Sequence, residues 1–303
     1  MGKGALYIIL TMPRIEGKEI AHEILERLKA LPKPEGFFAA ILVGSDPSSV
    51  NFVGQKAKVA ESLGIDFRIH RLSADIATDA LRREVARLSE PKTCAGCIVQ
   101  LPLPEGVNKH YALNAIPKWK DPDLLSESSL GAFYSGRHAV VPPAVAVAKE
   151  IIERQKLDLR SLRVAMIGKG FLIGKPIGFW LQDKVSELTI FDSKSKNIHD
   201  HLAEADIVVC GAGVARLFGA EHVKKGALVL DFGWNQVDGK LVGDFDAGSA
   251  GSPQGDSADL SQSKNIFYTP TPGGTGPILV AKLFENYFRL NDSGARSVAR
   301  DET

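Results

Sequence analysis

The stretch from residue 163 to residue 193 constrains the fold of this 303-residue chain more than any other. An apolar run of strand type leads into a glycine-rich turn and a segment with helical spacing, and a second apolar run ends in an acid. The turn and the end of the second run contain Gly168, Lys169, Gly170, Gly174, Asp192 and Ser193. Strand, turn, helix, strand and acid are the order of a βαβ dinucleotide-binding unit. The stretch therefore predicts a parallel α/β domain that binds a nicotinamide nucleotide.

The glycines and the acid have separate roles in such a unit. Glycine lets backbone N–H groups approach a pyrophosphate at the positive end of a helix, and the acid accepts hydrogen bonds from a ribose diol. The spacing Gly168-x-Gly170-x-x-x-Gly174 is one residue longer than the usual fingerprint. For the glycines taken alone, a plain strand-to-helix turn that needs positive φ is the alternative.

Length and charge limit the other function classes. The 303 residues suffice for about two domains. A net charge of +1 gives no electrostatic case for a nucleic-acid partner. The apolar run 5–12 is too short to span a bilayer, so we expect no membrane partner. We expect residues 1–12 and 292–303 to be terminal extensions.

The cysteines, Cys94, Cys97 and Cys210, are few and odd in number. Such usage favours a reducing cytoplasm over a disulfide framework. Cys94 and Cys97 have the CxxC spacing of a redox or metal pair, but an apolar run follows at once and the chain has no second CxxC. The seven histidines show no ligand pattern, so we expect no metal site.

The first half of the chain alternates between strand and helix character. Apolar runs predict strands, and apolar residues three or four apart predict the helices between them. The strands are expected at 37–43, 65–72 and 96–101, and the helices at 19–31, 50–63 and 79–88. This alternation implies a parallel sheet, whose ligands bind beyond the carboxyl ends of the strands. The residues after Val43 and Val99 should therefore face a cleft.

The second half continues the same pattern beyond the βαβ stretch. Strands are expected at 188–191, 207–210 and 227–231, and a closing helix at 278–288. A helix at 144–155, after two prolines, is expected to connect the two domains. Residues 246–263 are rich in Gly, Ser and Asp, which predicts a loop.

Several separated stretches resemble one family, the bifunctional methylenetetrahydrofolate dehydrogenase/cyclohydrolases. Over residues 15–288 they read VGSDPSS followed by Lys56, then GCIVQLPLP, KDPD, IGKGFLIGKP, DFGWN, GKLVGD and TPTPGGTGP. The patterns VQLPLP and TPxPGGxGP are very specific to that family. The resemblance implies an α/β fold of two domains, an N-terminal α/β folate domain and a C-terminal Rossmann-type nucleotide-binding domain, with a final helix that returns to the first domain.

The resemblance also implies boundaries and an activity. The substrate domain would comprise 13–145 and 277–291, and the NAD(P)-binding domain 146–276. Members are usually homodimers that oxidise 5,10-methylenetetrahydrofolate with NAD(P)⁺ and hydrolyse the methenyl product to 10-formyltetrahydrofolate in one-carbon metabolism. The hydrolysis needs a group that takes and returns a proton, which a lysine kept partly neutral in a dry cleft can do.

The resemblance places roles on particular residues. Lys56 aligns with the catalytic lysine, Gln100 with the glutamine that positions it, and Asp123 with the aspartate that binds the pterin. The structural alternatives are a solvated lysine, a strand-end glutamine and a turn aspartate. The implied substrate-binding residues are Phe52, Val99, Leu101, Pro272, Gly273 and Gly274. The implied cofactor-binding residues are Gly168, Lys169, Gly170, Gly174, Asp192, Ser193 and Trp234.

The chain departs from the family pattern at several positions. Phe52 stands where the family has tyrosine, Leu124 where it has glycine, and the residues 142–145 replace its Pro-Cys-Thr-Pro element. These changes bear on the hydrolysis step. Asp192 replaces a histidine, and an acid there repels a 2′-phosphate while accepting from a free diol. We therefore expect NAD rather than NADP as the preferred cofactor.

Three other interpretations remain open at the level of sequence. Phe52 favours a member that has only the dehydrogenase activity. A catalytically silent folate- or nucleotide-binding module would keep the fold without turnover. A dehydrogenase for a small hydroxy acid could share the architecture, because fold alone does not set the substrate.

Overall fold

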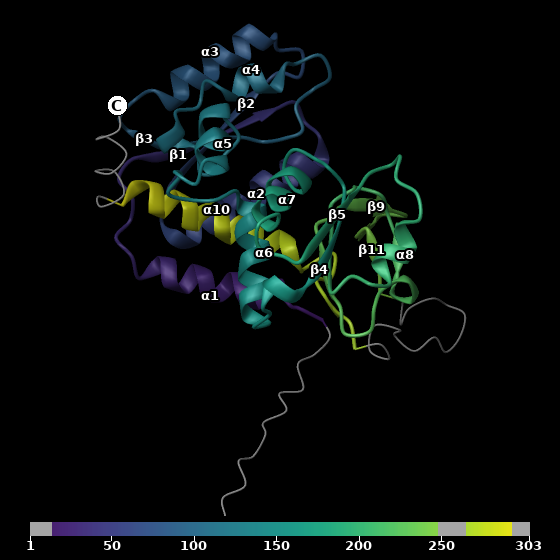
Figure 1. The fold of residues 1–303 in the computed structure, drawn as a ribbon. Coiled ribbons are helices and arrows are strands. Elements are labelled where there is room, and N and C mark those ends of the chain that lie inside the picture. Colours follow the sequence, from purple (N-terminus) through teal and green to yellow (C-terminus); the bar gives the residue numbers. More distant parts are fainter. Residues whose placement is uncertain (1–13, 248–264, 293–303) are drawn as a thin grey trace, which may run out of the picture. The chain divides into compact units, whose positions relative to one another are not determined.

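The computed structural model of the chain describes residues 14–247 and 265–292 (Figure 1). The expected extension at 1–12, almost all of the one at 292–303, and most of the loop at 246–263 lie outside the described residues. The described chain divides into two compact units. One consists of Leu157–Gly276 with residues 14–17, and the other of Lys18–Lys156 with residues 277–292. Both combine helices with parallel strands, which confirms the predicted α/β class.

The sheet of the Lys18–Lys156 unit has three parallel strands in the order β2-β1-β3. Its members are β1 (Phe37–Val43), β2 (Asp66–Leu72) and β3 (Cys94–Val99). Every residue of β1 and β3 is buried, whereas the edge strand β2 alternates between exposed and half-buried positions. Continuous apolar runs are what a parallel strand covered on both faces requires. Because β1 and β3 pair in parallel, their carboxyl ends lie at the same edge of the sheet.

The same unit contains seven described α-helices, named here in chain order. They are α1 (Gly17–Lys29), α2 (Pro47–Leu63), α3 (Thr78–Ser89), α4 (Lys109–Leu113), α5 (Glu127–Tyr134), α6 (Pro143–Arg154) and the last helix α10 (Thr275–Asn291). Helix α10, drawn in yellow in Figure 1, packs against β1 through aromatic rings. Phe38 of β1 stacks on Tyr287 with ring centroids 4.5 Å apart and meets the edge of Phe284 at 5.7 Å. The predicted return of the final helix is confirmed.

Local chemistry explains where the elements differ from the sequence prediction. Helix α2 starts at Pro47 rather than Val50, because Asp46 accepts a hydrogen bond from the N–H of Ser49 at 2.8 Å and caps the helix. The sequence also predicts no helix at α5. Ser126 caps α5 by accepting a hydrogen bond from the N–H of Ser129. The helix is so short that its apolar spacing gives no clear helical pattern in the sequence.

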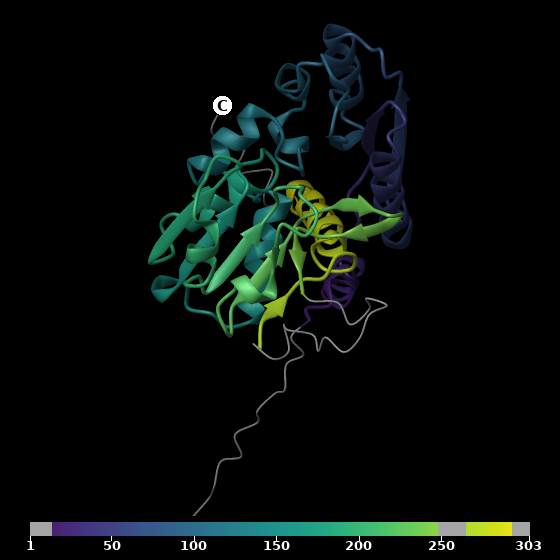
Figure 2. The same ribbon diagram turned by 90° about the vertical axis from the view of Figure 1, so that its right-hand side faces the viewer.

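The second unit contains a five-stranded parallel sheet in the order β12-β8-β6-β4-β5, shown with its strands side by side in Figure 2. The strands are β4 (Arg163–Ile167), β5 (Glu187–Phe191), β6 (Ile207–Cys210), β8 (Leu228–Asp231) and β12 (Phe267–Tyr268). Since the chain turns from β4 to β5 on one side and then to β6 on the other, the strand order reverses between β4 and β6. This reversal is the switch point of a Rossmann-type sheet.

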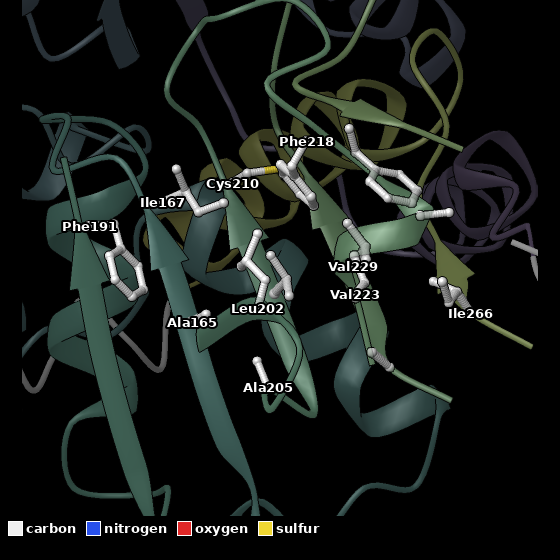
Figure 3. Close-up of a cluster of buried hydrophobic side chains, with 14 residues drawn as sticks. Ala165, Ile167, Phe191, Leu202, Ala205, Cys210, Phe218, Val223, Val229 and Ile266 are labelled. Carbon is white, nitrogen blue, oxygen red and sulfur yellow. The ribbon is translucent and has the colours of Figure 1, made fainter. Parts of the chain in front are cut away.

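Shorter elements complete this unit. They are α7 (Gly174–Leu181), α8 (Ile198–Leu202), the strand pair β7 (Phe218–Gly219) and β11 (Phe245–Asp246), and the hairpin β9 (Asn235–Val237) and β10 (Lys240–Val242). A buried apolar cluster covers one face of the sheet (Figure 3). Ala165, Cys210 and Val229 from three neighbouring strands pack there against Leu202 of α8 and Phe218 of β7. Among the described residues, no helix has the length and apolar character that a bilayer crossing needs.

Candidate active site

Lys56 lies on the buried face of α2, where a core helix ordinarily carries apolar residues. The buried positions of this helix are Ser49, Val53, Lys56, Ala60 and Leu63, which share one face at helical spacing. Only 4% of Lys56 is exposed. A solvated lysine, which is the structural alternative for this residue, is therefore excluded.

The ammonium nitrogen of Lys56 lies close to the side chains of three other predicted site residues. Lys56 Nζ donates to Gln100 Oε1 at 3.1 Å and lies 4.0 Å from Asp123 Oδ2. It also lies 5.0 Å from the centroid of the Phe52 ring. The structure thus brings Phe52, Lys56, Gln100 and Asp123 into one cluster within a single unit.

Gln100 is held in a fixed orientation at the end of β3. Its backbone N–H donates to Ile41 O at 2.9 Å, which extends the pairing with β1 by one residue. Its side-chain Nε2 donates to Leu101 O at 2.7 Å. Because the amide nitrogen is occupied in this way, the amide oxygen is the atom presented to Lys56.

Burial shifts the proton equilibria of the pair. Desolvation lowers the pKa of Lys56, and the nearby Asp123 charge opposes part of that shift. Desolvation raises the pKa of Asp123, against the pull of Lys56. About a quarter of the Asp123 side chain, 23%, remains exposed, so its end of the pair is open to solvent. Both shifts bring neutral forms closer to physiological pH, which suits a group that must take and return a proton.

The turn that carries Asp123 is fixed from two sides. The buried Asp121 carboxylate accepts from the N–H groups of Leu125 and Ser126 at 3.1 and 2.9 Å. Asn286 of α10 donates to Pro122 O at 2.9 Å. Leu124 adopts φ +52 and is 1% exposed. The turn therefore keeps a glycine-like backbone at Leu124, and the leucine side chain packs into the interior.

The remaining predicted substrate residues fall in two places. Val99 is the buried last residue of β3, and Leu101 follows Gln100. Pro272, Gly273 and Gly274 belong to the other compact unit. Gly273 has φ +104, and a Cβ on Gly274 would lie 2.6 Å from Pro270 O, so both positions require glycine.

The predicted nucleotide turn lies at the switch point between β4 and β6. Gly168 has φ +102, and a Cβ there would lie 2.8 Å from Gly211 O, the first residue after β6. A Cβ on Gly174 would collide with Gly168 O, whereas Gly170 has open space. Helix α7 begins at Gly174. Glycine at 168 and 174 allows this close backbone approach, and the N-terminus of α7 lies beside the turn, as in sites that bind a pyrophosphate.

The acid at the end of β5 is paired with the lysine of the turn. Lys169 Nζ donates to Asp192 Oδ2 at 3.0 Å, and 51% of the lysine side chain and 36% of the aspartate side chain are exposed. The hydrogen bond from Lys169 lowers the pKa of Asp192, assisted by the N–H of Lys194 at 2.9 Å. Ser193 is exposed beside it, and Trp234, just after β8, exposes about a third of its surface.

Two buried acids of the nucleotide unit were not among the predicted site residues. Asp231 and Asp244 lie with Cys210 in a group whose oxygen and sulfur atoms are all within 4.8 Å of one another. Burial, with the neighbouring Asp244 charge as a lesser cause, raises the pKa of Asp231 to about 6. A signal existed in the sequence, since Asp231 ends an apolar run and Asp244 follows a glycine, but it does not say what either acid binds.

The two cysteines of the CxxC pair are buried, and their thiols have low reactivity. Cys94 and Cys97 are both buried in β3, and burial raises the pKa of each thiol. Cys94 Sγ also donates to Gly96 O at 3.1 Å. Protonated, buried thiols are poor nucleophiles and poor metal ligands.

The two units together define a two-domain α/β protein with a Rossmann-type nucleotide unit and a buried-lysine cluster. The family model described as "Tetrahydrofolate dehydrogenase/cyclohydrolase, catalytic domain" matches residues 15–123. The family model described as "Tetrahydrofolate dehydrogenase/cyclohydrolase, NAD(P)-binding domain" matches residues 142–293. The chain belongs to the tetrahydrofolate dehydrogenase/cyclohydrolase family, as its motifs predict.

Individual relatives agree over nearly the whole chain. A "Bifunctional protein FolD" from Methanoculleus marisnigri is 34% identical over 279 residues, which are 91% of this chain and 95% of that protein. The crystal structure of the bifunctional enzyme FolD from Campylobacter jejuni has a TM-score of 0.83 at 28% identity and covers 92% of this chain and 98% of that one. The Trypanosoma brucei enzyme, complexed with NADP cofactor and inhibitor, has a TM-score of 0.81 at 29% identity, with coverage of 93% and 98%.

Proposed function

We propose that this protein oxidises 5,10-methylenetetrahydrofolate with NAD(P)⁺ and hydrolyses the methenyl product to 10-formyltetrahydrofolate. The observation that carries the proposal is the buried Lys56, held by Gln100 at 3.1 Å and by Asp123 at 4.0 Å. The family membership supports both activities.

In the hydrolysis step, Lys56 takes a proton from the attacking water and returns it to the folate nitrogen. Burial lowers the pKa of Lys56, so the neutral amine is accessible for this work. Gln100 fixes the position of the amine through its amide oxygen. Asp123, whose side chain is partly open to solvent, binds the amino and ring N–H groups of the pterin, a paired donor edge that suits a carboxylate.

Hydride transfer asks chiefly for orientation, because the folate nitrogens themselves stabilise the resulting cation. The nucleotide supplies the hydride acceptor, and its pyrophosphate binds at Gly168, Gly170 and Gly174. Phe52 stacks on the aminobenzoyl ring of the folate. The other residues proposed to contact substrate or nicotinamide are Val99, Leu101, Pro272, Gly273, Gly274, Ser193 and Trp234.

The preferred nucleotide is NAD⁺. Lys169 is the cation at the turn that could meet a 2′-phosphate, but Asp192 already accepts its hydrogen bond at 3.0 Å. Asp192 also presents a carboxylate where a free ribose diol can donate. The pair therefore offers acceptors for the diol and no free positive charge for a phosphate.

The assembly and location follow the family pattern. We infer a homodimer in the cytoplasm, with folate as its small-molecule partner and neither nucleic acid nor membrane as a partner. The net charge of +1 is consistent with the absence of a polyanionic partner.

An absorbance assay of the purified protein tests the proposal. It follows reduced cofactor and methenyl-folate together, with 5,10-methylenetetrahydrofolate and either NAD⁺ or NADP⁺. Reduced cofactor without accumulation of methenyl-folate shows both activities. No turnover with either cofactor would contradict the proposal.

A dehydrogenase-only enzyme is the second candidate, and Phe52 favours it. Its ring lies 5.0 Å from Lys56 Nζ and has no hydroxyl with which to relay a proton. The same assay separates the two candidates, because methenyl-folate accumulates if the hydrolysis step is absent.

A further inference from the structure

Asp244 and Asp231 are buried acids at the carboxyl end of the Rossmann-type sheet with no part in the chemistry above. They are 0% and 1% exposed. Each is surrounded by backbone N–H groups from loops that are far apart in the sequence. Their contacts show which loops depend on them.

Asp244 gathers the loop that follows β6. Its carboxylate accepts from three consecutive N–H groups, those of Ala212, Gly213 and Val214, at 2.7, 3.1 and 3.0 Å. Successive N–H groups that converge in this way form an anion-binding nest, which here is filled by a side chain of the protein itself. The Asn235 Nδ2 donates to the same carboxylate at 3.1 Å, so the residues after β8 are held as well.

Asp231, the last residue of β8, holds Asp244 in place. Its carboxylate accepts from the N–H groups of Gly233 at 2.7 Å, Phe245 at 3.1 Å and Asp244 at 3.3 Å. Its backbone carbonyl accepts from Thr275 Oγ1 at 2.8 Å, just after the Pro272–Gly274 turn. The two carboxylates therefore hold three segments, residues 212–214, 233–235 and 244–245.

The cluster with Cys210 is not a metal site. Its carboxylate oxygens already accept from backbone N–H groups, which a cation would repel. The group is also closely packed, because a Cβ on Gly243 would collide with Asp231 and one on Gly233 with Asp244. Cys210 Sγ lies 3.3 Å from Asp231 Oδ1, and burial raises the pKa of this thiol well above its usual range.

The loop that Asp244 holds forms one wall of the switch point. A Cβ on Gly168 would lie 2.8 Å from Gly211 O and 3.2 Å from Ala212 N, so the loop directly faces the nucleotide turn. Val214, whose N–H donates to this carboxylate, and Trp234, which precedes Asn235 in the chain, are two of the exposed large apolar side chains among the described residues. A ligand between the carboxyl ends of β4 and β6 would meet this wall.

We propose that Asp244 is a positioning residue for the dinucleotide: it fixes the 212–214 loop against the Gly168 turn, and Asp231 fixes Asp244. The inference rests on the proposed function, since it presumes that a nicotinamide nucleotide binds at this switch point. Asp244 acts through the loop and touches no reacting atom. Its removal is expected to affect nucleotide binding and to spare methenyl-folate hydrolysis, which uses no nucleotide.

The test compares Asp244→Asn with Asp206→Asn in the full chain. Asp206 precedes β6 at its opposite end and accepts from the N–H of Arg163 at 2.9 Å and from Lys224 Nζ. It therefore controls for the loss of a structural carboxylate in the same unit. Calorimetric titration with NAD⁺ and with NADP⁺ is combined with kcat and KM for both nucleotides and with methenyl-folate hydrolysis in their absence.

We expect Asp244→Asn to weaken nucleotide binding and raise the nucleotide KM by roughly 10- to 100-fold, the loss expected for hydrogen bonds to a charged acceptor. Hydrolysis should stay unchanged, and Asp206→Asn should lower Tm without changing nucleotide affinity. Equal nucleotide affinity in Asp244→Asn and the unchanged protein, or equal weakening by Asp206→Asn, would overturn the positioning role alone. Absence of nucleotide binding in the unchanged protein would overturn the proposed function as well.

A second variant keeps the test decisive if Asp244→Asn does not fold. Gly213 has φ +68 and open space around a built Cβ, so Gly213→Ala strains only the backbone of the loop. We expect it to weaken nucleotide binding by about 5-fold. Unchanged binding in this variant would show that the loop does not contribute to the nucleotide site.

Discussion

Each unit of the molecule holds a lysine beside an aspartate, and the two pairs behave in opposite ways. Lys56 and Asp123 are 4.0 Å apart in an environment that buries the lysine almost completely. Lys169 and Asp192 are 3.0 Å apart, with 51% and 36% of their side chains exposed. Burial raises the pKa of Asp123, whereas the hydrogen bond from Lys169 lowers the pKa of Asp192.

The difference shows that environment, more than distance, decides what an ion pair can do. In the shorter pair, the hydrogen bond from Lys169 favours the charged form of Asp192, which suits the proposed role of this acid in selecting between nucleotides. In the longer pair, desolvation disfavours both charges, which lowers the pKa of Lys56 and raises the pKa of Asp123. Four experiments sharpen or break this comparison.

Replacement of the two lysines should give the largest contrast. We expect Lys56→Met to reduce methenyl-folate hydrolysis by roughly 10²- to 10⁴-fold, the usual contribution of a general acid or base. Lys169→Met, the matched change at the exposed pair, should leave hydrolysis unaffected. Steady-state hydrolysis rates decide the point, and similar rates in the two variants would remove the distinction between the pairs.

Replacement of Asp123 should have the next largest effect. Asp123→Asn would remove the charged acceptor proposed for the pterin N–H groups, so we expect substrate KM to rise by roughly 10- to 100-fold. Because the Asp123 charge holds the pKa of Lys56 up, its loss should lower that pKa further. The acid limb of the hydrolysis rate should then move to lower pH. An acid limb that stays in place would show that another group titrates.

The loss of Lys56 should change how the stability of the protein depends on pH. The pKa of Lys56 is lower in the folded protein than its ordinary value of 10.5. Between the two values the unfolded chain binds more protons, so the contribution of Lys56 to the free energy of unfolding rises with pH. The difference between the parent and Lys56→Met should shift in favour of the parent by at most about 1.4 kcal/mol per pH unit. Denaturant unfolding at several pH values measures it, and a difference that stays constant with pH would contradict the expectation.

The smallest expected effect is on nucleotide choice. Asp192→Ala removes the carboxylate that accepts from Lys169, so the lysine becomes available to a 2′-phosphate. We expect the ratio of kcat/KM for NADP⁺ over NAD⁺ to rise by about 5-fold. A strong preference for NADP⁺ in the parent that the variant leaves unchanged would contradict the role given to Asp192.

The sequence predicts the parallel strands well because their signal is local. The strands β1 and β6 have the predicted bounds, since a continuous apolar run is both the cause of burial and the visible pattern. The helix α5 and the short strand pairs escape prediction, because their positions depend on caps and on partners distant in the chain.

The candidate site divides in the same way. Motif resemblance predicted that Lys56, Gln100 and Asp123 belong together, and the structure places them in one cluster. Their catalytic roles remain predictions. The left-handed backbone of Leu124 and the three N–H groups that converge on Asp244 could not be predicted, since residue type alone does not report the backbone geometry that tertiary contacts impose.

The stacking of Phe38 on Tyr287 has a consequence for how the chain matures during translation. The strands of the nucleotide unit all lie within residues 163–268, so its sheet can form before α10 is complete. The core around β1, by contrast, needs rings made about 250 residues later. Phe67 can meet Phe38 early, with ring centroids 5.3 Å apart in the folded unit, but the stacking partner of Phe38 is missing until α10 has been synthesised.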